Sequence, residues 1–513
     1  RGRSSCQLAS MPTAVSAGAS SSKDAARDAE EGFKDDGMPE IGKAIAAMPF
    51  SFWHYQQTFA VAMVFLAAGT TTAALSWIED DIRSVFNLTP AQELPIVFSS
   101  LAAVTLSLFT AGATADQLGR KSTGLFGLWS LLVTQMSIGA AQSPAAVALL
   151  FGLRGFSVHF AEDAAKGYLT EVLPARGRGM VLNLLHATWQ LGGILFSCIT
   201  VFTTAYTQLA VFSSLSAAVA LFFFISFTVE SPLWLDRNRG RQAGLKGLRK
   251  MYIACNQPWP GADSPLSDPE PPMPAAAKLV SQAGSGCCSC CGSCGSCCQP
   301  RQCGQRVWAV LNRAYGPLLG EHRKLTALIT LLYISMQLGT WSNDTWLKRM
   351  LGESGKEDLE TLASFLQYGC KFSGAILGGL VVEKTGRKML MIPCFVLVSL
   401  GTFMIGLSTR LEAEASTRLF FCAMVLLYVP IEVLASTLGT FTYESFPTSV
   451  RVASLGVARG IAGILGTTYA SVGPMIMGAF GPAVLFFINA GILLVGSATC
   501  LLISRDTTGV TLN

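Results

Sequence analysis

The chain has 513 residues, of which 51% are hydrophobic and only 13% are charged, whereas soluble globular chains contain about 25% charged residues. This composition excludes an ordinary water-soluble domain and indicates a membrane protein. The formal net charge of +5 is small for this length, and the cations flank apolar segments without forming an aromatic-interleaved basic stripe, so nucleic acid is excluded as a partner.

The first 50 residues lack periodic apolar positions and are rich in Ala, Ser and mixed charge. We therefore predict a disordered cytosolic tail over residues 1–50. No charged segment followed by an apolar run is visible there, so we expect no secretory leader.

Apolar runs of about 20 residues, the length that crosses a bilayer as a helix, begin near residue 57 and continue to about residue 503. They form two groups of six. The runs fall near residues 57–77, 94–115, 122–141, 145–170, 180–203 and 206–228, and near 324–344, 361–382, 389–407, 419–442, 453–477 and 481–503. This pattern predicts an all-α membrane protein of twelve transmembrane helices in two six-helix bundles, at 51–230 and 323–505, with a short cytosolic tail at 506–513.

A ten-residue motif lies between the second and third run of each group. It reads Gly112-Ala-Thr-Ala-Asp116-Gln-Leu-Gly119-Arg120-Lys121 in the first group and Gly379-Leu-Val-Val-Glu383-Lys-Thr-Gly386-Arg387-Lys388 in the second. Each copy has an acid four residues after the first glycine, a second glycine three residues later, and two cations. The recurrence predicts that the two bundles are related halves.

A second repeated motif follows the fourth run of each group. Glu171, Pro174 and Arg178 have the same spacing as Glu444, Pro447 and Arg451. A single further motif, Glu230-Ser-Pro-Leu-Trp-Leu, follows the sixth run.

Together these motifs resemble the major facilitator superfamily over residues 50 to 505. Within it, the E-S-P-x-W-L and Y-E-x-F-P-T-x-x-R patterns resemble the branch of synaptic vesicle glycoproteins and organic ion transporters, and sugar porters are the next closest. The resemblance implies the fold of two pseudo-symmetric bundles, and it implies that the loop motifs form a cytosolic latch between outward-open and inward-open states. The alternative is that they only determine topology. The branch often has acids in the first span, where this chain reads Ala67-Ala-Gly-Thr70-Thr71-Thr72; this departure counts against proton coupling there.

The connecting loops predict the orientation, because Lys and Arg are retained on the cytosolic side. Arg120, Lys121, Arg387 and Lys388 all lie in connections from an even to an odd span. We therefore expect these loops and both termini to be cytosolic, in either the plasma membrane or an intracellular vesicle membrane. Two N-x-[ST] sequons, at Asn87 and Asn343, then fall on the outer side.

Between the halves lies a long connection, residues 231–322, rich in Pro, Gly and Ser. It contains eight cysteines: Cys287, Cys288, Cys290, Cys291, Cys294, Cys297, Cys298 and Cys303. A soft-metal site or a palmitoylated patch is one interpretation, and an unstructured insert is the other. Since the cysteines have no histidine partners and no fixed pairs, we favour the insert and expect neither a metal nor a cofactor.

Several ionisable residues lie within the spans, where their burial in hydrocarbon is costly and indicates an interior or water-filled location. In the fourth span, the spacing allows pairing of His159 with Asp163 and of Glu162 with Lys166. Lys371 and Glu432 each precede the acid of a repeated motif by twelve residues, which places both about 18 Å along a helix from the cytosolic end.

The repeat relates further residues. The offset of 273 residues between Glu171 and Glu444 maps Glu432 onto His159 and Arg459 onto His186. Matching positions suggest one cavity shared by both halves, as in transporters that bind their solute near the midplane. The predicted solute and ion pathway is His159, Glu162, Asp163, His186, Trp189, Gln190, Lys371, Glu432 and Arg459. The alternative is that these charges only neutralise one another, with the histidines as ordinary core residues.

Enzyme signatures are absent from the sequence. The Gly112 to Ser122 segment does not meet the phosphate-loop spacing, and neither a nucleophile elbow nor a zinc-peptidase pattern occurs. We predict a monomeric transporter, not an enzyme, that moves a small polar or charged organic solute by alternating access. Organic cation, organic anion and neutral sugar all stay open, as do uniport and proton symport. A second hypothesis is a transporter-like receptor or vesicle protein that recruits partners through the central loop.

Overall fold

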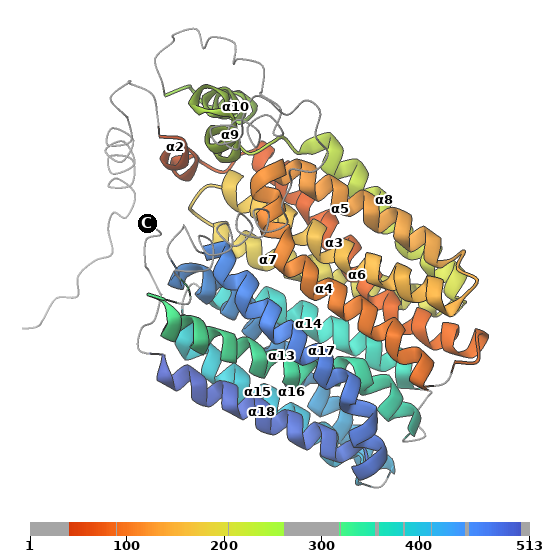
Figure 1. The fold of residues 1–513 in the computed structure, drawn as a ribbon. Coiled ribbons are helices and arrows are strands. Elements are labelled where there is room, and N and C mark those ends of the chain that lie inside the picture. Colours follow the sequence, from red (N-terminus) through yellow and green to blue (C-terminus); the bar gives the residue numbers. More distant parts are fainter. Residues whose placement is uncertain are drawn as a thin grey trace, which may run out of the picture.

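The computed structural model describes residues 40–88, 90–203, 205–260, 318, 320–353, 359–382, 385–411, 413–446 and 451–503. Regular structure within these ranges is helical and contains no strand (Figure 1). The cysteine-rich insert and the segment 506–513 lie outside the described residues, as does the predicted tail up to residue 39.

Six long helices form the first bundle. α3 packs against α7 and α8, α6 packs against α4 and α5, and α5 also contacts α8. Their bounds are α3 (Phe52–Val85), α4 (Pro90–Leu118), α5 (Arg120–Ile138), α6 (Pro144–Val172), α7 (Arg178–Thr200) and α8 (Tyr206–Phe227).

The second bundle repeats this arrangement. α13 packs against α17 and α18, α16 packs against α14 and α15, and α15 contacts α18. The bounds are α13 (Arg323–Glu353), α14 (Glu360–Val381), α15 (Arg387–Ser408), α16 (Ala413–Ser445), α17 (Arg451–Phe480) and α18 (Pro482–Leu502). Eight of these twelve helices are long and apolar enough, over the described residues, to cross a membrane. The predicted fold of two six-helix bundles is confirmed.

The two bundles meet along two equivalent helix pairs. α7 of the first bundle packs against α14, and α17 of the second bundle packs against α4. Exchanging each helix for its counterpart converts one contact into the other, so the halves are related by a pseudo-twofold axis. Figure 1 shows the bundles side by side, with α3 to α8 in one and α13 to α18 in the other.

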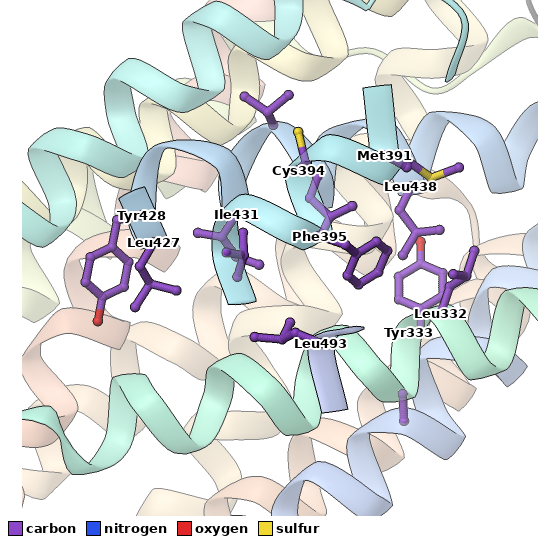
Figure 2. Close-up of a cluster of buried hydrophobic side chains, with 14 of the residues drawn as sticks. Leu332, Tyr333, Met391, Cys394, Phe395, Leu427, Tyr428, Ile431, Leu438 and Leu493 are labelled. Atoms are coloured by element: carbon purple, nitrogen blue, oxygen red, sulfur yellow. The ribbon is translucent and has the colours of Figure 1, made fainter. Parts of the chain in front are cut away.

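Each bundle has its own apolar core. In the second bundle, Figure 2 shows Phe395, Leu427, Tyr428 and Leu493 converging from α15, α16 and α18. Each of these side chains is almost completely buried, and because lipid is as apolar as these side chains, close packing between helices supplies the stabilisation. The cores therefore support each bundle separately, and the interface between bundles is free to carry polar residues.

Local chemistry marks the ends of several helices. Ser143 precedes Pro144 and caps α6, where its side chain accepts a hydrogen bond from the Ala146 amide. Between α4 and α5, Gly119 has φ 104°, and a Cβ there would lie 2.5 Å from Glu230 Oε2. Both the backbone angle and the space require glycine. Gly386, its counterpart, has φ −57°, so the repeat is not identical in backbone.

Three short helices gather at one end of the first bundle (Figure 1). They are α2 (Ile41–Ala47), α9 (Pro232–Arg239) and α10 (Arg241–Ala254). α10 buries Leu245, Leu248 and Met251 in the core cluster that also contains Ile41 and Ile45 of α2. Residues 41–47 therefore form a packed helix, although we predicted a disordered tail for residues 1–50. Just beyond α10, burial raises the pKa of the Cys255 thiol.

Candidate solute pathway and loop-end ion pairs

The first repeated motif builds a buried ion pair at one end of the first bundle. The Arg120 guanidinium donates from Nε and Nη2 to Glu171 Oε1 at 3.0 and 2.8 Å. Nη2 also lies 2.6 Å from Asp116 Oδ1, and Nη1 donates to the Ala115 carbonyl at 2.7 Å. The ends of α4, α5 and α6 are thus joined through one side chain.

The second copy forms the same contacts. Arg387 donates from Nε and Nη2 to the two oxygens of Glu444 at 3.1 and 2.9 Å, and from Nη1 to the Val382 carbonyl at 2.7 Å. The following lysine is also equivalent, because Lys121 donates to the Thr228 carbonyl and Lys388 to the Ile503 carbonyl at the ends of α8 and α18. The two motifs are therefore equivalent in contacts as well as in sequence.

The remaining predicted residues of these motifs lie outside the two arginine–glutamate contacts. Glu230 Oε1 accepts hydrogen bonds from the backbone amides of Arg120 and Lys121 at 2.9 and 3.2 Å, which places a negative charge at the N-terminus of α5, where it is stabilising. Arg178 donates to the Leu173 carbonyl. A Cβ on Gly379 would lie 3.7 Å from Asn183 of the other bundle. Gly112 is half-buried in α4. Glu383 and the Arg451 side chain lie outside the described residues.

A cavity of about 160 Å³ lies within the second bundle. Its polar lining comes from α13, α14 and α16, and includes the predicted Lys371 and Glu432. The lining residues are Met336, Thr340, Trp341, Asn343, Asp344, Lys371, Leu427, Tyr428, Ile431, Glu432 and Ala435.

Asp344 is a cavity residue that sequence reasoning missed. Its carboxylate accepts from Lys371 Nζ at 2.8 Å and from Gln367 Nε2 at 3.0 Å, and the Lys371 ammonium also lies 5.1 Å from the centre of the Tyr428 ring. Asp344 was overlooked because it belongs to the sequon at Asn343. A lysine within a span requires a nearby acid, and this requirement was the available signal.

The Asn343 sequon, which we predicted on the outer side, lies within a helix and not in a loop. Asn343 is 1% exposed and lies inside α13. Its side chain amide donates to Thr402 at 3.1 Å, and its carbonyl accepts from Asn489 at 2.7 Å. An asparagine held in this way positions α13 beside the cavity and cannot receive a glycan.

Glu432 links the two bundles. Its Oε1 lies 3.4 Å from His186 Nδ1, and its Oε2 accepts a hydrogen bond from Gln190 Nε2 at 3.1 Å; both partners are on α7. The other ring nitrogen of His186 lies 3.5 Å from Lys166 Nζ. Lys166, His186 and Glu432 therefore form a continuous chain of titratable groups that ends at the cavity.

A second contact between the bundles joins Asp163 of α6 to Arg459 of α17, whose Oδ1 and Nη1 lie 3.7 Å apart. His159 contacts Glu162 at 3.1 Å and stacks on Trp189 with ring centres 5.8 Å apart. The predicted pairs of His159 with Asp163 and of Glu162 with Lys166 are not the hydrogen-bonded pairs that form. Asp163 instead reaches a cation of the other bundle, which the spacing along one helix cannot reveal.

Two symmetric helical bundles around a polar, charge-lined interior define a membrane transporter of small solutes. The sequence profile of the sugar (and other) transporter family matches residues 54–257 and 310–513. The chain belongs to that family, and it is a transporter and not an enzyme.

Relatives of known name cover most of the chain. The inner membrane metabolite transport protein YgcS of Escherichia coli (strain K12) is 22% identical over 80% of this chain and 84% of its own length. The niacin transporter NiaP of Acinetobacter baylyi is 20% identical over 92% of this chain and 99% of its own length. Among solved structures, the partially occluded, inward-open xylose transporter XylE of Escherichia coli is similar with a TM-score of 0.67 and 15% identity, covering 90% of this chain and all of that one. The last similarity concerns the fold alone.

Proposed function

We propose that this protein is a proton-coupled secondary transporter, in which a small polar or charged organic solute binds at the cavity of the second bundle, beside its interface with the first. The observation that carries the proposal is the position of Glu432. It lines the cavity, its side chain is 9% exposed, and it contacts two residues of the opposite bundle. One carboxylate is thus adjacent both to the solute space and to the interface that must open.

The contacts of His186 assign its tautomer. A charged Lys166 can only donate, so His186 Nε2 is the acceptor at 3.5 Å. Nδ1 then bears the hydrogen and points toward Glu432 Oε1. His186 thus lies between Lys166 and the Glu432 carboxylate.

Protonation of Glu432 removes the charge that attracts His186 and Gln190. The contact of α16 with α7 weakens, and the bundles can then rock relative to each other about the α7–α14 and α4–α17 pairs. Release of the proton on the other side restores the contact. A proton is thereby coupled to the exchange between the two open states.

The repeated loops and both termini face the cytosol in this proposal, because Arg120, Lys121, Arg387 and Lys388 lie at that end. Arg120–Glu171 and Arg387–Glu444 each hold helix ends of one bundle together there, so that each bundle can rock as a unit. The pathway is complete within one chain, so the monomer is the transporting unit in the lipid bilayer.

The relatives indicate which solutes to test. Their names include a niacin transporter, inositol transporters and an organic cation/carnitine transporter. Full-length protein in proteoliposomes should be supplied with labelled nicotinate, myo-inositol, carnitine and xylose, with and without an acidic exterior.

We expect uptake of at least one solute to rise with the proton gradient and to fall when a protonophore is added. Empty liposomes provide the control for leakage. Uptake that ignores the gradient would exclude proton coupling, and uptake of no solute across a wide panel of polar organic compounds would reject the proposed transport.

A further inference from the structure

Arg154 is a buried cation that the pathway described above does not use. It lies on α6, in the part of the helix nearer the end opposite the repeated loops, and is 3% exposed. Its Nη2 donates to the Thr71 carbonyl at 2.5 Å and to Thr72 Oγ1 at 3.3 Å. Nε is buried without any hydrogen-bond partner among the described residues.

The absence of a nearby acid distinguishes Arg154 from four of the cations described above. Arg120, Arg387, Lys371 and Arg459 each have a carboxylate within 4 Å. Arg154 forms no ion pair with the residues that the structure describes. A buried guanidinium without a counter-charge is costly, and a fork of donors with unused positions is the geometry that carboxylates bind best.

The segment of α3 that faces Arg154 has the residues for such a site. Residues 67–73 contain three threonines and no acid, so no internal carboxylate competes for the guanidinium. Thr72, unlike Arg154, is exposed.

Tyr368 of the other bundle packs against the first bundle near this position. Its ring packs against Gly193 of α7, where a Cβ would lie 2.3 Å from the ring, and it joins the core cluster of the first bundle. It interacts electrostatically with both Arg154 and Asp344, and Asp344 lines the cavity. When the α7–α14 contact changes as the bundles rock, the tyrosine moves relative to Arg154 and the guanidinium gains access to the solute space.

We propose that Arg154 binds the carboxylate of the transported solute, so that the substrate is an organic anion and supplies the counter-charge missing from the protein. This assignment deepens the proposed function, on which it rests. Thr72 contributes a hydroxyl to the same site, and Tyr368 closes it in the conformation seen here.

The test uses full-length protein in detergent and pairs of probes that differ only in charge: benzoate with benzamide, and lactate with lactamide. We expect one or more carboxylates to raise the unfolding temperature while the matching amide does not. Arg154→Gln should weaken this binding about tenfold or more, and Arg154→Lys should retain part of it. Arg239→Gln, which changes an exposed cation next to Trp234, should leave the shift unchanged.

Thr72→Asp separates binding from a merely structural role. A carboxylate installed beside Arg154 should raise the unfolding temperature without ligand and abolish the response to the probes. Because this variant supplies the missing charge, it keeps the test decisive if Arg154→Gln fails to fold. A probe response that survives in Thr72→Asp would overturn the assignment.

Two further outcomes also overturn it. A panel of carboxylates that behaves like its amides means that Arg154 binds no solute carboxylate. A chloride response that depends on Arg154 and equals the carboxylate response means that the site takes an inorganic anion. Gradient-driven uptake of neutral solutes only would reject this assignment and leave the proposed transport intact, whereas Arg154-dependent carboxylate binding without any uptake would do the reverse.

Discussion

Glu432 on α16 lies 3.4 Å from His186 on α7 of the opposite bundle, and the pseudo-twofold axis gives this contact a counterpart. Asp163 on α6 lies 3.7 Å from Arg459 on α17. Exchanging α16 for α6 and α7 for α17 relates the two pairs, and Arg459 occupies the position that corresponds to His186. The carboxylate in the first bundle is one helical turn away from the position that corresponds to Glu432. One pair contains a histidine, whereas the other contains an arginine, which stays charged.

This difference predicts distinct roles, and Glu432→Gln tests the first. Glutamine keeps the size and hydrogen-bonding ability of the side chain but cannot bind a proton. We expect gradient-driven accumulation to fall about tenfold or more, while exchange of solute across the membrane without a gradient continues. Uptake and counterflow in proteoliposomes measure the two activities.

Glu162→Gln is the matched control for this variant. Glu162 is as buried as Glu432, but its hydrogen-bond partner His159 is on the same helix. Gradient-driven uptake should therefore be reduced much less than in Glu432→Gln. Normal accumulation by Glu432→Gln would show that the proton is carried elsewhere.

Asp163 and Arg459 should act as one unit. Asp163→Asn and Arg459→Gln each remove this charge–charge contact between the bundles, so each should slow uptake. The double variant should be no slower than the worse single variant, with an interaction energy of about 1 kcal/mol or more. Initial uptake rates of the four proteins complete the cycle, and simple additivity would contradict a functional contact.

The ion pair at the loop end of the first bundle predicts a difference in stability between two acids that contact the same arginine. The Glu171 side chain is 17% exposed and that of Asp116 is 59% exposed. Glu171→Gln leaves Arg120 partly uncompensated in a buried location and should cost about 2–3 kcal/mol. Asp116→Asn should cost less than about 1 kcal/mol, since exposed pairs contribute little.

Unfolding temperatures in detergent compare these two variants. Equal losses of stability in Glu171→Gln and Asp116→Asn would mean that the buried ion pair contributes no more than the exposed one. The mirrored variant Glu444→Gln should resemble Glu171→Gln, because Arg387 also donates from Nε and Nη2 to its acid, in this case to the two separate oxygens of Glu444.

The features that depend on spacing along the chain were predictable. Helix ends leave a regular trace in sequence, because glycines, capping residues and cations must recur where apolar runs stop; the Gly119 and Gly386 motifs identified two related halves for this reason. The run near 57–77 nevertheless continues as helix to Val85, since a helix can extend beyond the apolar segment that crosses the membrane.

Partners across the bundles were not predictable in the same way. Sequence spacing reveals neighbours three or four residues apart on one helix, which is why His159 and Asp163 were paired. The observed partners of Asp163 and Glu432 are hundreds of residues away and depend on how two separate bundles meet. Arg154 was missed for a related reason, because an unpaired cation is recognisable only when all of its surroundings are known.

Gly193 offers a test of the interface between bundles that involves no charge. A Cβ at this position on α7 would lie 2.3 Å from the ring of Tyr368 on α14, so Gly193→Ala must displace that ring or separate the helices. We expect a loss of about 1–3 kcal/mol in stability, typical of overpacking, together with slower uptake. Gly369→Ala on α14 is the control, since nothing lies within 4 Å of a Cβ there and alanine has a higher helix propensity than glycine.

Adding Tyr368→Leu to Gly193→Ala should restore much of the lost stability, because the smaller side chain leaves room for the methyl group. Unfolding temperatures of the three variants decide the matter, and a Gly193→Ala protein as stable as Gly369→Ala would show that the two bundles do not pack through this tyrosine.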